Sequence, residues 1–151
     1  MTTPKIEVQR SDEVGASPRA AALRRWARAA LDGIGETGSL CIRLVGEAEM
    51  TDLNVRYRNK QGTTNVLSFG VDMVAPDGGE RLLGDVVICA PVVTVEASLQ
   101  GKTEADHFAH LVVHGVLHLC GFDHETAAEA QVMEGREVAI LQTLGINDPY
   151  R

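Results

Sequence analysis

The order of hydrophobic and polar residues along the chain predicts helices that alternate with short strands. In residues 17–33 the apolar side chains recur at helical spacing, and Ser17 as the cap with Pro18 at the first helical position is typical of a helix start. The apolar face of this helix comprises Leu23, Trp26, Ala27, Ala30 and Leu31. A second helix is expected at residues 48–60, and a third begins at Pro91.

Three further segments have the pattern of β-strands. Residues 39–45 alternate along two faces, and residues 65–70 and 82–90 are apolar runs of strand length. Residues 74–80 form a turn-rich loop. The pattern predicts an α/β (α+β) fold, and because no repeat or linker interrupts it, we expect one compact domain over residues 1–151.

All five histidines lie within residues 107–124, HFAHLVVHGVLHLCGFDH. Thr103 and Asp106 have the spacing of a helix-capping box, so a helix is expected to run from there until Gly121 ends it. At about 100° per residue, the first four histidines point within roughly 60° of one direction. These four are His107, His110, His114 and His118. After Gly121 the chain can reverse, which returns His124 toward the same face.

Three of these imidazoles have the spacing of a metal site. His114, His118 and His124 follow the pattern HxxxHxxxxxH, and a second capping box at Thr126 and Glu129 comes next. Three histidines without a cysteine thiolate leave a fourth coordination position open to water, whereas structural zinc sites usually close with four ligands. The pattern therefore favours a hydrolytic metal site.

The residue after His114 limits which hydrolytic reactions the metal site could catalyse. Zinc proteases of the HExxHxxGxxH type carry a glutamate there as the general base, and this chain has Gly115. A phosphodiester substrate fits better, because a metal can neutralise charge on a phosphoryl oxygen while an arginine stabilises the rest. Arg56, Arg58 and Lys60 are the candidate RNA contacts, although a solvated helix end explains the same charges.

Composition limits the partners and the compartment. The formal net charge of −7 argues against long-range attraction to a polyanion, so any nucleic-acid contact must be local. No apolar run approaches a membrane span and the start lacks the core of a signal peptide, so we expect a cytoplasmic protein without membrane contact. The three cysteines form no CxxC pair, and no structural disulfide is expected.

The histidine segment also resembles a known family. HGVLHLCGFDH at residues 114–124 resembles the HGxLHLxGYDH signature of the YbeY family of bacterial metal-dependent endoribonucleases, with Phe122 where the family usually has Tyr. The resemblance continues in NVRYRNKQGTTNVLSF, LLGDVVIC and MEGREVAILQTLG, and these segments cover most of residues 40–150.

The resemblance implies a mixed sheet of about four strands wrapped by helices. It implies one zinc ion on His114, His118 and His124, although imidazoles also suit nickel and other divalent metals. It implies cleavage of single-stranded RNA, maturation of ribosomal RNA at the 3′ end of 16S rRNA, and ribosome quality control. The implied partners are RNA and the small ribosomal subunit or its assembly factors, not DNA. By matched position the functional arginine is Arg58, the expected catalytic residue.

Several roles stay open at this stage. Asp123 either orients an imidazole or makes an Asx turn, and the general base and the nucleophile are unassigned. One alternative function is a ribosome-associated binding module with a structural metal, which a fourth ligand at His107 or His110 would support. Others are a metallopeptidase-like hydrolase with Glu125 as a substitute carboxylate, and a packed histidine cluster without metal. Cys120 is expected to be a buried thiol.

Overall fold

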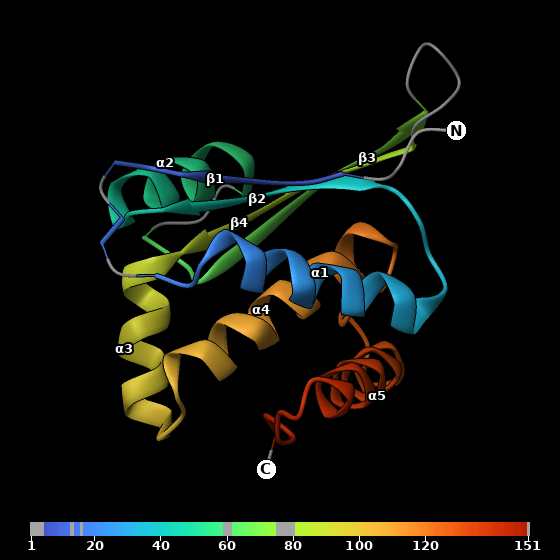
Figure 1. Cartoon of the computed structure of the whole chain (residues 1–151). Coiled ribbons are helices and arrows are strands. Elements are labelled where there is room, and N and C mark those ends of the chain that lie inside the picture. The colour runs from blue at the N-terminus through green and yellow to red at the C-terminus, as the bar shows by residue number, and fades with distance from the viewer. Residues whose placement is uncertain (1–4, 13, 16, 59–61, 75–80, 151) are drawn as a thin grey trace.

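The fold is a four-stranded sheet with helices on both faces (Figure 1). The structure is a computed structural model that describes residues 5–12, 14–15, 17–58, 62–74 and 81–150. The strands are β1 (Ile6–Arg10), β2 (Ser39–Val45), β3 (Val66–Val74) and β4 (Arg81–Cys89). The helices are α1 (Ala20–Ile34), α2 (Glu47–Arg58), α3 (Ala90–Gln100), α4 (Glu104–Leu119) and α5 (Ala127–Thr143).

The strands lie in the order β1-β2-β4-β3, and β3 alone runs antiparallel to its neighbour. The expected mixed sheet of about four strands is therefore confirmed. Among the described residues, β3 pairs with no strand on its outer side, so it is an edge strand. No helix in the described ranges is both long and apolar enough to cross a membrane.

The start of α1 differs from the sequence prediction. The helix begins at Ala20 with Arg19 at the cap position, and no side chain caps it. The hydroxyl of Ser17 instead accepts a hydrogen bond from Arg10, at the end of β1. The expected apolar face of α1 is correct, because the five residues predicted for it are all buried.

Strands β3 and β1 also differ from the sequence prediction. Strand β3 continues to Val74, at the start of the expected loop, and residues 75–80 of that loop lie outside the described residues. Strand β1, with the sequence IEVQR, was not predicted. Five residues with two apolar side chains are too few to give a clear alternation, and its parallel pairing with β2 comes from distant sequence.

Alternate residues of β4 pack into two separate cores. Val86 and Ile88 belong to the large cluster formed with α1, α4 and α5, whereas Val87 and Cys89 pack with Met50 of α2. Figure 1 shows α1 and α4 on one face of the sheet and α2 on the other. Because both faces are covered, β4 reads as a continuous apolar run instead of an alternating one.

Helix α4 is the most buried helix next to the sheet, and its ends follow the predicted signals. The Thr103 hydroxyl accepts a hydrogen bond from the Asp106 backbone N–H at 3.1 Å, which caps the N-terminus. At the other end the helix stops at Leu119, and Gly121 takes a φ of 97°, a conformation that favours glycine.

Gly115 sets how closely α4 approaches the sheet. A β-carbon at this position would lie 2.5 Å from Cγ1 of Val86 and 3.3 Å from Oγ of Ser68. The Ser68 hydroxyl also donates a hydrogen bond to the Gly115 carbonyl oxygen at 3.1 Å. Residue 115 therefore faces β3 and β4 at a point where a side chain does not fit without displacing its neighbours.

We expect Gly115→Ala to lower the free energy of unfolding by about 1–3 kcal/mol, because the added methyl group overpacks a tight contact with the stiff side chain of Val86. Gly135→Ala on α5 is the matched control. A β-carbon there meets nothing within 4 Å, so the same change should stabilise the helix by about 0.5–1 kcal/mol. Urea unfolding of both variants measures the difference. A Gly115→Ala protein as stable as wild type would show that the contact is not tight.

Candidate metal centre and adjoining cavity

Three imidazoles converge where α4 meets the turn that follows it. His114 and His118 lie one helical turn apart with ring centroids separated by 4.7 Å. The ring of His124 lies 5.3 Å from that of His114 and 4.8 Å from that of His118. One ligand nitrogen from each ring lies within 4.8 Å of the other two. The structure thus brings together the three histidines selected from the sequence.

The turn that carries His124 is built from backbone hydrogen bonds. The N–H of Gly121 donates to the His118 carbonyl at 3.1 Å, and the N–H of Phe122 donates to the Leu117 carbonyl at 3.0 Å. Phe122 packs against the large core cluster, which holds the turn against α4. The ring that replaces the family's usual tyrosine therefore contributes packing.

Asp123 makes a local contact in this turn. Its Oδ1 accepts a hydrogen bond from the backbone N–H of His124 at 2.8 Å. The same oxygen lies 3.6 Å from Nδ1 of His124, which is too far for a hydrogen bond. Of the two roles considered for Asp123, the geometry favours the turn contact.

A buried carboxylate lies behind the histidines. Oε1 of Glu137, on α5, is 2.8 Å from Nε2 of His110 and 3.2 Å from Nδ1 of His114. The hydroxyl of Tyr150 donates to the same carboxylate, at 3.0 Å from Oε2. Only 1% of the Glu137 side chain is exposed. Burial alone would raise the pKa of Glu137, but the hydrogen bonds from His110 and His114 outweigh it and lower the pKa to about 2.

Glu137 determines which ring nitrogen His114 presents to the group formed by His114, His118 and His124, which we call the triad. An ionised carboxylate only accepts hydrogen bonds, so Nδ1 of His114 carries the proton and Nε2 keeps its lone pair in the neutral ring. Burial, with help from the neighbouring imidazoles of His114 and His124, lowers the pKa of His118. The lowered pKa of His118 favours its neutral ring, which is the form that binds a metal. The donor set therefore fits a divalent cation.

The remaining two histidines have other partners. His110 bonds to Glu137. Together with His114 these two residues form a second convergent group, but its members are already joined by hydrogen bonds to Glu137. His107 is buried, and its Nε2 lies 2.9 Å from Oε1 of Glu96. Neither His107 nor His110 belongs to the group formed by the other three, so the fourth-ligand arrangement expected of a structural site is absent among the described residues.

Beside the triad, a cavity of about 620 Å³ opens along the edge strand β3; we call it the histidine cavity. Tyr57 and Arg58, in the last turn of α2, form part of its wall. The rest of its lining consists of residues 64–69, His114, His118 and residues 123–125. A larger cavity of about 1000 Å³ lies at β1 and includes none of the histidines.

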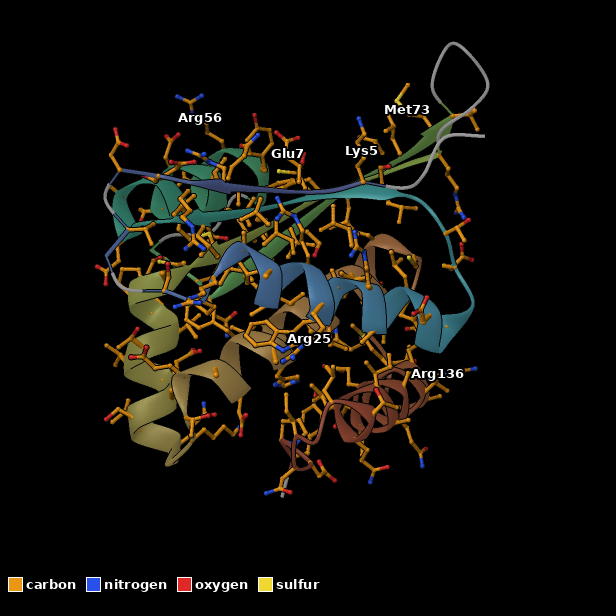
Figure 2. All side chains as sticks on the ribbon, in the orientation of Figure 1. Lys5, Glu7, Arg25, Arg56, Met73 and Arg136 are labelled. Atoms are coloured by element: carbon orange, nitrogen blue, oxygen red, sulfur yellow. The ribbon has the colours of Figure 1, made fainter. Side chains whose placement is uncertain are left out.

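The structure places the candidate RNA-contacting residues differently relative to the histidine cavity. Arg58 is exposed and lines the histidine cavity together with the triad. Arg56 does not line it, and Nε of Arg56 pairs with Oδ1 of Asp52 at 3.1 Å on the outer side of α2 (Figure 2). Lys60 lies outside the described residues. Glu125 is on the cavity wall, as the metallopeptidase alternative required, and no hydrogen bond or ion pair joins its side chain to another described residue.

Sequence reasoning missed Glu137 and Tyr150. Glu137 shares the buried face of α5 with Met133, Ile140 and Leu141, so a charged residue at core spacing was the available signal. Tyr150 lies beyond α5, and no local pattern connects it to the histidines. The three cysteines form no disulfide bond in the described residues.

The chain matches known proteins over nearly its whole length. Residues 6–145 match the family model described as Endoribonuclease YbeY. A protein named Endoribonuclease YbeY from Alkalilimnicola ehrlichii is 58% identical, covering 89% of this chain and 82% of the relative. Namesakes from Nitrosococcus oceani and Methylococcus capsulatus are 49% and 51% identical, covering 96% and 97% of this chain and 95% of each relative.

One solved structure has the same fold. The solution structure of TM1509 from Thermotoga maritima aligns with a TM-score of 0.59 and 20% identity, over 97% of this chain and 99% of the other. At this identity the likeness concerns the fold alone. The family model and the close relatives together confirm the resemblance seen in the sequence: the chain belongs to the endoribonuclease YbeY family.

Proposed function

We propose that this protein cleaves single-stranded RNA in the histidine cavity, with one divalent metal ion, zinc, held by His114, His118 and His124. Membership of the family makes the chain a hydrolytic endoribonuclease, which confirms the class of enzyme predicted from the sequence. The observation that carries the proposal is that the three imidazoles and Arg58 line one cavity.

The imidazoles and Arg58 of the cavity suit a phosphodiester. A metal bound there would neutralise charge on a phosphoryl oxygen and lower the pKa of water. Arg58 can donate paired hydrogen bonds to a phosphate and stabilise the negative charge that develops during cleavage. Glu137 keeps Nε2 of His114 turned toward the metal position. The preference for a single strand over a duplex follows from the family resemblance.

The finer assignments rest on the resemblance. It supports ribosomal RNA as the substrate, notably the 3′ end of 16S rRNA, with the small ribosomal subunit or its assembly factors as partners. We further propose a cytoplasmic location and one functional domain over residues 1–151. The net charge of −7 fits RNA that a partner presents, because an acidic surface does not gather a polyanion from solution.

Cleavage of an RNA fragment that carries the 16S 3′ end tests the proposed site. We expect His118→Ala to abolish cleavage and Arg58→Ala to reduce kcat roughly 100- to 1000-fold, the loss typical of removing one group that stabilises transition-state charge. Arg56→Ala should have a smaller effect, because Arg56 pairs with Asp52 away from the cavity.

Arg136→Ala is the control for loss of a positive charge. Arg136 is exposed on α5, and its side chain points away from the rest of the molecule in Figure 2, so activity should stay at the wild-type level. Circular dichroism establishes that each variant is folded. Equal activity in all variants would point to a contaminating nuclease and would contradict the proposal.

Metal removal separates a catalytic from a structural metal. The large core cluster contains none of the three histidines, so the chelated protein should lose cleavage while it still unfolds cooperatively in urea. Zinc added at 100 times its Kd should raise the free energy of unfolding by about 2.7 kcal/mol. Loss of the helical signal on chelation would instead favour the binding module with a structural metal.

Glu137→Gln tests the carboxylate behind the triad. The amide can no longer hold the proton on Nδ1 of His114 by a charged hydrogen bond, so we expect metal affinity to fall roughly 10- to 100-fold. Glu134→Gln, the same change one turn earlier on α5, should leave affinity unaltered. Competition with a chromophoric chelator measures both affinities, and equal values for the two variants would show that Glu137 does not position His114.

A further inference from the structure

We propose that Tyr57 and Phe69 hold an unpaired nucleobase of the RNA in a second cavity beside the histidine cavity. This inference rests on the proposed function and assigns the base next to the phosphate at which cleavage occurs. The second cavity measures about 390 Å³ and lies between α2 and the sheet; we call it the α2 cavity. Tyr57 and Phe69 line both cavities, so their rings form the partition between them.

The ring of Tyr57 is available to a ligand. Its side chain comes from the last turn of α2, and the residue is 65% exposed, an unusual state for a large aromatic side chain. The ring of Phe69 meets it edge-on, with centroids 5.4 Å apart and an angle of 72° between the planes. This contact holds the orientation of Tyr57 and covers at most one face of its ring, and the exposure of the residue leaves ring surface open to stack on a base.

The α2 cavity has the surface that a base needs. Phe69, Leu53 and Val87 line it. Val87 is buried in the core beneath α2 and the other two pack against that core, so this part of the wall is apolar. Nucleobases of single-stranded RNA are recognised by stacking on aromatic side chains, with polar groups at their edges. Aromatic residues make up only 4% of this chain, which makes a partly exposed aromatic pair beside Arg58 and the triad a notable concentration.

The charges of the two cavities fix which part of a nucleotide enters each. In the α2 cavity, Arg43 is already held by Glu49 through two hydrogen bonds of 2.7 and 2.9 Å. Asp85 adds a negative charge on the same wall. A phosphate is therefore repelled from the α2 cavity, which accepts an uncharged base. In the histidine cavity, Arg58 and a divalent metal on the three histidines would together outweigh the carboxylates of Asp123 and Glu125 and attract the phosphate. The phosphate and its neighbouring base then lie on opposite sides of the Tyr57–Phe69 partition.

The test measures binding of a short single-stranded RNA to the metal-free protein, so that the RNA stays intact. Tyr57→Ala is expected to raise Kd roughly 5- to 100-fold, the range of base–aromatic stacking. Tyr57→Phe, which keeps the ring, should bind as wild type does. Tyr57→Leu, which keeps apolar contact with Phe69, should resemble Tyr57→Ala. Val55→Ala removes another exposed apolar side chain from α2 and serves as the matched control without effect.

An RNA series with one abasic nucleotide at successive positions identifies the base. At one position the missing base should weaken binding to wild type by a similar factor and have little effect on Tyr57→Ala, because both changes remove the same contact. Equal binding by wild type and Tyr57→Ala, or an abasic penalty that is the same in both, would overturn the inference.

Cleavage by the metal-loaded wild type, run in parallel, separates the two proposals. If that protein cleaves the RNA in a His118-dependent way while Tyr57→Ala binds normally, the base site is wrong and the proposed function stands. If wild type neither binds nor cleaves the RNA, both are wrong.

Discussion

The close contact between α4 and the sheet at Gly115 determines the geometry on which the site depends. Because residue 115 has no side chain, the helix axis comes near enough for Ser68 to bond to the Gly115 carbonyl and for Val86 to pack against the backbone. The neighbouring His114 then lies beside β3, where the wall of the histidine cavity begins. A bulkier residue would separate the helix from the strand and so move the ligands away from the wall that carries Arg58.

A second layer of polar contacts keeps this helix in register with its neighbours. Glu137 connects α5 and Tyr150 to His110 and His114. Glu96 does the same for α3, since its carboxylate accepts hydrogen bonds from the side chains of His107 and Asn65. The four histidines of α4 thus serve two purposes. His107 and His110 are joined to buried or half-buried carboxylates, whereas His114 and His118 line the cavity, and His114 also bonds to Glu137.

Sequence reasoning was sufficient for the part of the site whose geometry depends on spacing within one segment. The triad lies within one helix and its terminal turn, so helical periodicity and the glycine were sufficient to bring His114, His118 and His124 together. Residues that reach the site from distant segments were beyond such reasoning. Glu137 comes from another helix, β1 forms only by pairing with β2, and the position of Arg58 beside the triad, implied by resemblance, depends on how α2 packs across the sheet edge.

The histidine cavity takes its wall from segments far apart in the chain, and this has a consequence for synthesis. Arg58, strand β3, the triad and residues 123–125 share one cavity only after α4 has packed on the sheet, and Glu137 follows later in the sequence. During synthesis, His114 gains the carboxylate that orients it only when α5 has been made and has docked. The C-terminal part of the chain thus completes a site whose ligands stand earlier in the sequence.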